Sequence, residues 1–269
     1  MSVGGLPFWQ CSLILFLATP AEEAGVLGAA RARGIDPRKL RHPILGEYHW
    51  LGQVGDEVVI APRPARQGGR VVMGSQGRLG TAARGLRFRE ATGAFGIVQI
   101  GMAFGVQPEA QGLGDVLVST SLIPYDNRVV RDHADGGGRY LVDHREAGRE
   151  AARASLVELF LRERHRDVDR DYRVHFGALL SGAARIHSAS YRDELIRGAA
   201  AGVDPIVGGE MEGVGLLAAS AGPDDPSWCI VKGISDFADS DRDHVIGEAR
   251  AKACRNAADF VLSALQNDR

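Results

Sequence analysis

Two acidic clusters lie in the C-terminal third of the chain, and each follows an apolar run. The first holds Glu210 and Glu212 within Ile206–Gly213, and the second holds Asp236 within Trp228–Asp239. Both patterns place a carboxylate next to glycine, where an apolar strand should end. In open α/β sheets, ligands bind beyond the carboxyl ends of the strands. The two clusters therefore predict a binding or catalytic site.

The carboxyl group of Asp236 allows two interpretations. A carboxyl group partly buried at a sheet edge can keep its proton near neutral pH. In that form it can protonate a leaving group. An aspartate in this position can equally cap a turn, because its side chain readily bonds nearby backbone amides. The local sequence leaves both interpretations open.

Glu212 lies at a predicted junction between a strand and a helix, where the helix N-terminus stabilises a carboxylate. Its two oxygens can also accept hydrogen bonds from a ribose diol. Glu210 lies two residues earlier and shares a face with Glu212 in an extended chain. Close carboxylates repel each other, so the pair requires a proton or a cation. Lys232 is the candidate cation.

A third carboxylate, Glu22, follows the apolar run Ser12–Ala18. After Pro20 it can be simply an acid in the first turn of a helix. The segment Gly101–Gly105 has the glycines of a loop that approaches a ligand, but it lacks the dinucleotide-binding spacing. The sequence contains no phosphate-binding loop, no serine-hydrolase elbow and no metal-ligand spacing. We expect neither a cofactor nor a metal.

The elements that must position these residues alternate between strands and helices. The predicted strands are Ser12–Ala18, Val54–Ala61, Arg70–Met73, Gly96–Ile100, Asp115–Ser121, Tyr172–Ser181, Pro205–Gly209 and Trp228–Ile234. The predicted helices are Glu22–Ala32, Leu79–Thr92, Glu146–Arg164, Glu194–Ala201 (capped from Ser190), Val214–Ala221 and Val245–Leu265. Alternation indicates a mostly parallel α/β core, in which three or four middle strands pair antiparallel. Arg33–Gly46 and Tyr125–Gly138 are expected to be connections.

The chain has 269 residues, of which 45% are hydrophobic and 25% are charged, as in ordinary globular proteins. No linker or repeat divides it, and we expect one domain over residues 1–269. A net charge of −2 and arginines interleaved with acids argue against nucleic-acid binding. The N-terminal apolar run is too short for a bilayer, and no basic residue precedes it. With three dispersed cysteines, we expect a cytoplasmic protein that binds no membrane.

The order of these motifs resembles the purine nucleoside phosphorylase and nucleosidase superfamily, closest to the methylthioadenosine/S-adenosylhomocysteine nucleosidase branch. The resemblance covers most of the chain and rests on Ala18–Glu22, Gly101–Gly105, Glu210–Gly213 and Ile234–Asp239. It implies a three-layer αβα sandwich with a central mixed, mostly parallel sheet. It also implies a homodimer or higher homo-oligomer, since pockets of this family border a subunit interface.

The resemblance implies a role for each matching residue. Asp236 would protonate or hydrogen-bond N7 of the purine, with Ser235 in support. Glu212 and Met211 would hold the ribose. Further contacts with the substrate are implied for Glu210, Lys232, Met102, Ala103, Phe104, Ile186 and Phe237. The transition state would resemble an oxocarbenium ion, which nearby carboxylates stabilise.

Glu22 separates the two chemistries of the superfamily. Phosphorylases place glycine and arginine after the first strand to bind phosphate, whereas this chain has Pro20–Glu22. A carboxylate repels phosphate but can orient and deprotonate water, and the resemblance implies that Glu22, Glu212 and Lys232 form the water site. We therefore predict hydrolysis of the N-glycosidic bond of an adenine-type purine nucleoside or nucleotide. The alternatives are a phosphate-dependent phosphorylase and a catalytically weak nucleotide-sensing module.

The chain departs from the nucleosidase pattern at two positions. Lys232 stands where that branch has arginine, and lysine lacks the bidentate grip of a guanidinium group. Arg185 stands where that branch has an aromatic residue. It can stack through its guanidinium plane, or it can bind a phosphate. The basic segments Arg63–Arg66 and Arg128–Arg131 can likewise bind a phosphorylated substrate or form solvated loops.

Overall fold

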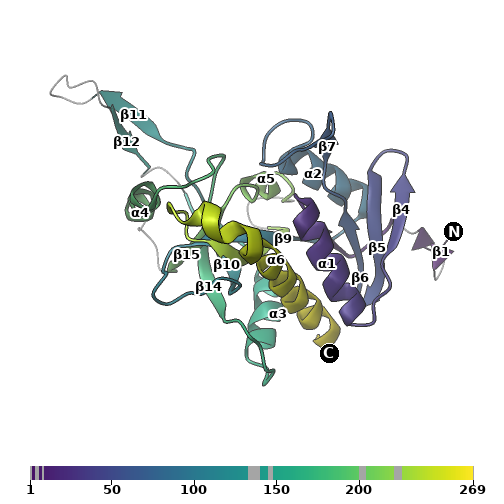
Figure 1. Ribbon diagram of the computed structural model, residues 1–269. Helices are drawn as coiled ribbons and strands as arrows, with labels where there is room; N and C mark the ends of the chain where they lie inside the picture. Colours follow the sequence, from purple (N-terminus) through teal and green to yellow (C-terminus); the bar gives the residue numbers. More distant parts are fainter. Residues whose placement is uncertain are drawn as a thin grey trace.

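The computed structural model describes residues 2–3, 6–7, 9–132, 140–144, 148–199, 204–220 and 226–268 (Figure 1). The helices are α1 (Pro20–Ala32), α2 (Thr81–Thr92), α3 (Ala154–Arg164), α4 (Ala189–Gly198), α5 (Val214–Leu217) and α6 (Arg242–Asn267). The strands of the main sheet are β3 (Leu13–Phe16), β4 (Arg38–His42), β5 (Gly46–Val54), β6 (Glu57–Pro62), β9 (Gly96–Gly105), β10 (Val116–Pro124), β13 (Glu150–Ala151), β14 (Val174–Ser181), β15 (Ile206–Glu210) and β16 (Trp228–Asp236). Short strands form three further pairs: β1 (Ser2–Val3) with β2 (Leu6–Pro7), β7 (Arg66–Gln67) with β8 (Arg70–Val71), and β11 (Val129–Asp132) with β12 (Tyr140–Asp143).

The main sheet is mixed, and part of it closes on itself. Its strands follow the order β13-β10-β14-β15-β9-β3-β6-β5-β4, and β16 pairs with both β10 and β9. The path from β9 through β16, β10, β14 and β15 therefore returns to β9. Along this ring, Phe104 of β9 pairs with Gly209 of β15 on one side and with Asp236 of β16 on the other. Ring closure thus brings the two acidic clusters to one rim.

Helices cover both faces of this sheet (Figure 1). A side chain added at Gly96 of β9 would contact Leu156 of α3, whereas the next residue, Ile97, lies against Gly85 of α2. Neighbouring residues of a strand point to opposite faces, so α2 and α3 lie on opposite faces. Helices α1 and α3 pack on α6, and α5 packs on α2. This arrangement confirms the expected three-layer α/β fold with a central mixed sheet.

The strands that lead to the predicted site are buried along their whole length. Every residue of β3 and of β16 is buried, which explains their continuous apolar runs, since a strand covered on both faces needs no polar side. Helix α6 lies directly on β16: a side chain at Gly233 would overlap the backbone of Ala253. This close approach fixes the end of β16 against α6.

The edge of the sheet after α1 differs from the prediction. Arg33–Gly46 was expected to be a connection, but Arg38–His42 forms β4, which pairs antiparallel with β5. β4 is an outer strand with mostly exposed or half-exposed residues, and charged edge strands carry no apolar alternation. The predicted strand Val54–Ala61 is in fact the end of β5, a turn at Gly55 with φ of 61°, and most of β6.

Two predicted loops are partly strands. Within Tyr125–Gly138, residues 129–132 form β11, which pairs with β12, and residues 133–138 lie outside the described residues. Gly101–Gly105 is not a loop, because β9 continues to Gly105. Its backbone groups pair with β16 and then with β15. The glycines therefore serve the close approach of side chains rather than a turn: Glu22 lies against Gly101, and Phe237 and Gln111 lie against Gly105.

Several helices differ in length from the prediction. α3 begins only at Ala154, because Glu150–Ala151 pairs with β10, and residues 146–147 lie outside the described residues. α4 begins at Ala189 because the hydroxyl of Ser188, not Ser190, accepts the N–H of Tyr191. The predicted ends of α4 and α5, residues 201 and 221, also lie outside the described residues. Among the helices described here, none is long and apolar enough to cross a bilayer.

Candidate active site

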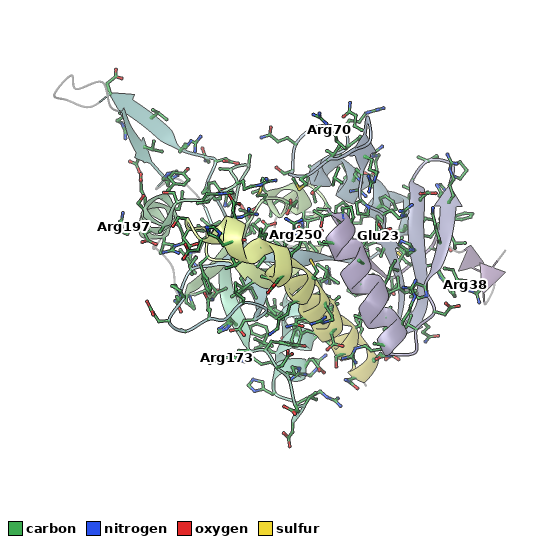
Figure 2. All side chains as sticks on the ribbon, viewed as in Figure 1. Glu23, Arg38, Arg70, Arg173, Arg197 and Arg250 are labelled. Atoms are coloured by element: carbon green, nitrogen blue, oxygen red, sulfur yellow. The ribbon has the colours of Figure 1, made fainter. Side chains whose placement is uncertain are left out.

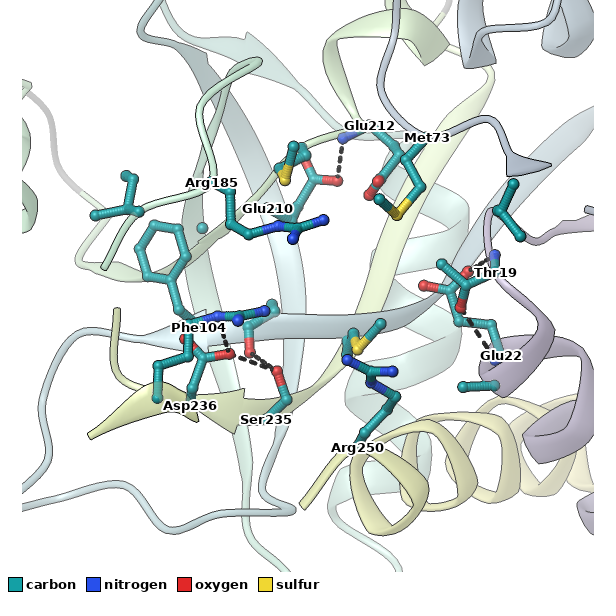
Figure 3. Close-up of a pocket in the computed structure, with 18 of the residues that line it drawn as sticks. Thr19, Glu22, Met73, Phe104, Arg185, Glu210, Glu212, Ser235, Asp236 and Arg250 are labelled. Carbon is teal, nitrogen blue, oxygen red and sulfur yellow. Dashed lines mark hydrogen bonds and ion pairs between the residues drawn. The ribbon is translucent and has the colours of Figure 1, made fainter. Parts of the chain in front are cut away.

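A cavity of about 410 Å³ opens at the rim where β9, β15 and β16 meet. Ten of the predicted site residues line it: Glu22, Met102, Ala103, Phe104, Ile186, Glu210, Met211, Glu212, Ser235 and Asp236. Lys232 and Phe237 do not line it. The close-up in Figure 3 shows Glu22 on one side of this space, Asp236 and Ser235 on another, and Glu212 with Glu210 on a third.

Glu22 reaches the cavity from the first turn of α1, which begins with a capping box. The hydroxyl of Thr19 accepts the N–H of Glu22, and Glu22 Oε2 accepts the N–H groups of Thr19 at 2.9 Å and Ala18 at 2.6 Å. The structural interpretation of Glu22 as a helix-start acid is therefore correct for this oxygen. The other oxygen, Oε1, lies over Gly101, where any side chain would overlap it.

The environment of Glu22 favours a proton on its carboxylate. Only 1% of Glu22 is exposed, and burial raises its pKa from 4.5 to about 7. The charge of Lys232 opposes this shift, and that of Glu212 adds to it. A carboxyl group with a pKa near 7 can accept a proton at neutral pH, which suits a general base.

Glu212 presents one oxygen to the cavity and the other to Lys232. Its Oε2 accepts a hydrogen bond from Nζ of Lys232 at 2.8 Å. The carboxylate of Glu210 lies 3.2 Å from the same nitrogen and accepts the N–H groups of Glu212 and Gly213, each at 2.9 Å. Glu210 thus shapes the turn that positions Glu212, although it was predicted as a substrate contact.

Lys232 lies beneath the site, fully buried. Burial by itself would lower its pKa, but the charges of Glu212, Glu210 and Glu22 outweigh burial and raise the pKa well above the ordinary value. The ammonium group therefore stays charged and holds the carboxylates in place. The expected pairing of Lys232 with the acidic cluster is confirmed, and its position behind the carboxylates leaves no direct path to a ligand in the cavity.

Asp236 ends β16 and is held by two hydrogen-bond donors and one cation. Its Oδ2 accepts the hydroxyl of Ser235 at 2.8 Å, and its Oδ1 accepts the N–H of Ala238 at 3.0 Å. The guanidinium Nε of Arg242 lies 3.5 Å from Oδ2. Ala238 has a φ of 54°, a backbone conformation unusual for a residue with a side chain. The tight turn after Asp236 aims its carboxylate at the cavity.

The aromatic residues divide between the cavity and the core. Phe104 lines the cavity, and its ring packs so closely on Gly209 that a side chain there would overlap it. The ring of Phe237 packs instead against Gly105, and its carbonyl accepts Arg192 Nη1 at 2.7 Å. Phe237 was predicted as a substrate contact, but it lies behind the lining.

Sequence reasoning missed several residues of the lining: Thr19, Val71, Met73, Arg242 and Arg250. The last two lie eight positions apart on α6, a spacing that keeps them within about 80° around a helix axis. That spacing, directly after Asp236, was a usable signal. Met73 follows the separate pair β7–β8, and no pattern in the sequence connects it with the site. Among the residues described, no cluster of His, Cys, Asp and Glu is arranged to hold a metal ion.

Solved structures with this fold include S-adenosylhomocysteine nucleosidase from Streptococcus pyogenes in complex with 5-methylthiotubericidin. It is 20% identical, with a TM-score of 0.70, and the match covers 99% of this chain and 100% of that one. The 5'-methylthioadenosine/S-adenosylhomocysteine nucleosidase from Neisseria meningitidis, in complex with methylthio-immucillin-A, is 17% identical with a TM-score of 0.69. That match covers 94% of this chain and 98% of the nucleosidase. Both likenesses concern the fold.

A curated relative is the death domain-containing ATP nucleosidase of Amphimedon queenslandica. It is 25% identical over 281 residues, which cover 95% of this chain and 48% of the relative. The chain thus spans about half the length of that protein. The sequence model of the phosphorylase superfamily matches residues 15–266. The expected kinship is confirmed: this chain belongs to the phosphorylase superfamily.

Proposed function

We propose that this protein hydrolyses the N-glycosidic bond of an adenine-type purine nucleoside or nucleotide and releases the free base. The observation that carries the proposal is the meeting of Glu22, Glu212 and Asp236 around one cavity. The curated relative and the structural neighbours named above are nucleosidases, which supports the same reaction class.

Asp236 assists departure of the base. As the C–N bond breaks, negative charge develops on the purine, and a proton or hydrogen bond delivered to N7 stabilises it. Asp236 of β16 pairs with Phe104 of β9 in the closed part of the sheet, and the side chain of Phe104 lines the same cavity. General acid catalysis of this kind contributes typically ~10²–10⁴ in rate.

Glu212 holds the ribose. Its Oε2 is bound to Lys232, while Oε1 has no hydrogen-bond partner in the described part of the chain and can accept from the diol. Met211 lines the cavity beside it. Positive charge develops on the ribose in an oxocarbenium-like transition state, so a fixed carboxylate at this position stabilises the transition state more than the substrate.

Glu22 activates water. Its Oε2 is bound to backbone N–H groups, which leaves Oε1 to accept a proton from a water molecule. With a pKa of about 7, the carboxyl group can cycle between its two forms at neutral pH. A carboxylate on this wall disfavours phosphate as the nucleophile.

The test is release of adenine from adenosine and AMP in buffer stripped of phosphate, followed by chromatography. We expect the free sugar or sugar phosphate as the second product, at a rate that added phosphate does not increase. A strict requirement for phosphate would identify a phosphorylase instead. Tight binding of the substrate without any adenine after long incubation would identify a nucleotide sensor.

Three further expectations stay predictions: one domain over residues 1–269, a cytoplasmic location and a homodimer or higher homo-oligomer. The family resemblance supports the last of these. Analytical ultracentrifugation at micromolar concentration decides it, since a monodisperse monomer would contradict an assembly through the pocket rim.

A further inference from the structure

Two arginine side chains on the cavity wall have no task in the proposed mechanism. Arg185 comes from the segment between β14 and α4, and Arg250 comes from α6; both are exposed and line the cavity. A guanidinium group is charged at any physiological pH. Figure 3 shows both labelled side chains directed toward the interior of the cavity from different sides.

Neither arginine has a carboxylate partner among the residues that the structure describes, unlike the other cations of the site. Lys232 lies 2.8 Å from Glu212, and Arg242 lies 3.5 Å from both Asp236 and Asp243. These paired cations hold the carboxylates of the site. Arg185 and Arg250 therefore remain available to a ligand.

The position of Arg250 sets it apart from arginines on the outer surface. In Figure 2, the labelled Arg70, Arg173 and Arg197 lie toward the edges of the view, whereas Arg250 is labelled on α6; of these four arginines, only Arg250 lines the cavity. Arg255, five residues further along α6, is exposed and does not line the cavity. Arginines on the same helix thus differ in whether they reach the site.

We propose that Arg185 and Arg250 bind the phosphate of a purine nucleotide, so that the substrate class is the phosphorylated nucleotide rather than the free nucleoside. This inference rests on the proposed function. A neutral nucleoside offers no anion to two unpaired guanidinium groups. A phosphate ester offers charged oxygens whose geometry matches the guanidinium fork, and such charge-assisted hydrogen bonds are about twice as strong as neutral ones.

The experiment compares adenosine, AMP and ATP as ligands of the wild-type chain and of Arg185→Gln and Arg250→Gln. The matched control is Arg255→Gln, which removes the same charge from the same helix. Isothermal titration gives affinity, and adenine release gives kcat/KM. We expect the wild type to prefer a nucleotide over adenosine. Each site variant should reduce that preference by about 10-fold or more, and the control should keep it.

Each other outcome has a definite meaning. Equal affinity of the wild type for adenosine and both nucleotides would overturn the inference, as would an equal loss of preference in Arg255→Gln. If inorganic phosphate is required and the variants raise its KM, the arginines bind the nucleophile, and both proposals fail. If nucleotides bind better than adenosine through these arginines but release no adenine, the proposed function fails and the phosphate site stands. If no compound binds, both fail.

Discussion

At the scale of single residues, the three carboxylates of the site differ in what holds them. Glu22 is fixed by backbone N–H groups, Glu212 by the ammonium group of Lys232, and Asp236 by the hydroxyl of Ser235 and the N–H of Ala238. Within the described residues, Glu22 and Glu212 each keep one oxygen without a protein partner. The protein therefore holds these hydrogen-bond acceptors in place before a ligand binds, so binding loses little further side-chain entropy.

Replacement of Asp236 by asparagine should lower turnover far more than it weakens binding. Asparagine keeps the size and can still accept the N–H of Ala238, but it has no acidic proton for the base. We expect kcat to fall by ~10²–10⁴ with a change of only a few-fold in the Kd for AMP. Single-turnover kinetics and titration measure the two quantities.

The matched control for this prediction is Asp241→Asn, an exposed aspartate just before α6 that makes no side-chain cap. It should retain wild-type kcat. Wild-type turnover in Asp236→Asn would remove Asp236 as the group that helps the base leave.

The site residues that could be predicted from the sequence are those that directly follow or end an apolar strand. Glu22 after a buried strand, and Asp236 at the end of another, lie at the rim as expected. Met73 was not predicted because its access to the site depends on tertiary packing, whereas Arg250 was missed although its helical spacing from Arg242 was a signal. Phe237, in contrast, follows Asp236 directly, yet its ring turns away to fill the space beside Gly105.

At the scale of secondary-structure elements, the site depends on how closely α1 approaches β9. The first turn of α1 places the carboxyl group of Glu22 directly over Gly101 of β9. β9 is held in place against α1 because it is paired within the closed part of the sheet, where Gly101 pairs with Lys232 of β16. Glycine is therefore needed for space at this position, not for backbone freedom.

Gly101→Ala should displace Glu22 and impair hydrolysis. The added methyl group would overlap Glu22 Oε1, so either the carboxyl group rotates or α1 shifts. We expect kcat/KM to fall by at least ~10²-fold, the size of effect that a misplacement of about 1 Å can produce. Gly28→Ala is the control because Gly28 lies in α1 with no atom in the way of an added side chain. It should keep activity and stabilise α1 by about 0.5–1 kcal/mol; equal activity of both variants would contradict the steric argument.

Helices and strands were predicted correctly where burial imposes a hydrophobic pattern on the sequence. The prediction failed for strands that are defined only by their hydrogen bonds to a partner strand. β3, β16 and α6 have long apolar runs or stripes because they pack on both sides or along one face. β4 and β11 are short and mostly exposed, so neither alternation nor hydrophobicity marks them. Their strand conformation depends on a partner strand, which local sequence does not specify.

At the scale of the whole molecule, the sheet buries a cluster of charges beside its core. Glu22, Glu210, Glu212 and Lys232 are all at most 6% exposed. A buried carboxylate is costly unless it is paired, and one ammonium group must serve three carboxylates. Burial is the largest cause of the raised pKa of Glu22, about 7 against 4.5, and the nearby charge of Glu212 adds to it. Ring closure of the sheet and the close approach of α1 to β9 together bring these groups into one cluster.

This cost predicts how the stability of the molecule depends on pH. Between pH 4.5 and 7, the folded state binds the Glu22 proton more tightly than the unfolded state does. The free energy of unfolding therefore falls as pH rises through this window, by roughly 3 kcal/mol for this group, and changes no further above pH 7. Glu22→Gln removes the titrating group and keeps an oxygen for the N–H groups of Ala18 and Thr19.

Glu22→Gln should thus be inactive yet more stable than the wild type at pH 8, with little difference at pH 5. Urea unfolding at the two pH values measures this. Glu23→Gln is the control, because the pKa of Glu23 is shifted in the opposite direction. Burial raises the pKa of Glu23, but hydrogen bonds from Arg63 and His49 outweigh burial and lower it. Its carboxylate therefore stabilises the fold at pH 8 and less so in acid, and its loss should be more harmful at pH 8. A less stable Glu22→Gln at pH 8 would show that the Glu22 carboxylate supports the fold, and the water-activating role would lose its energetic argument.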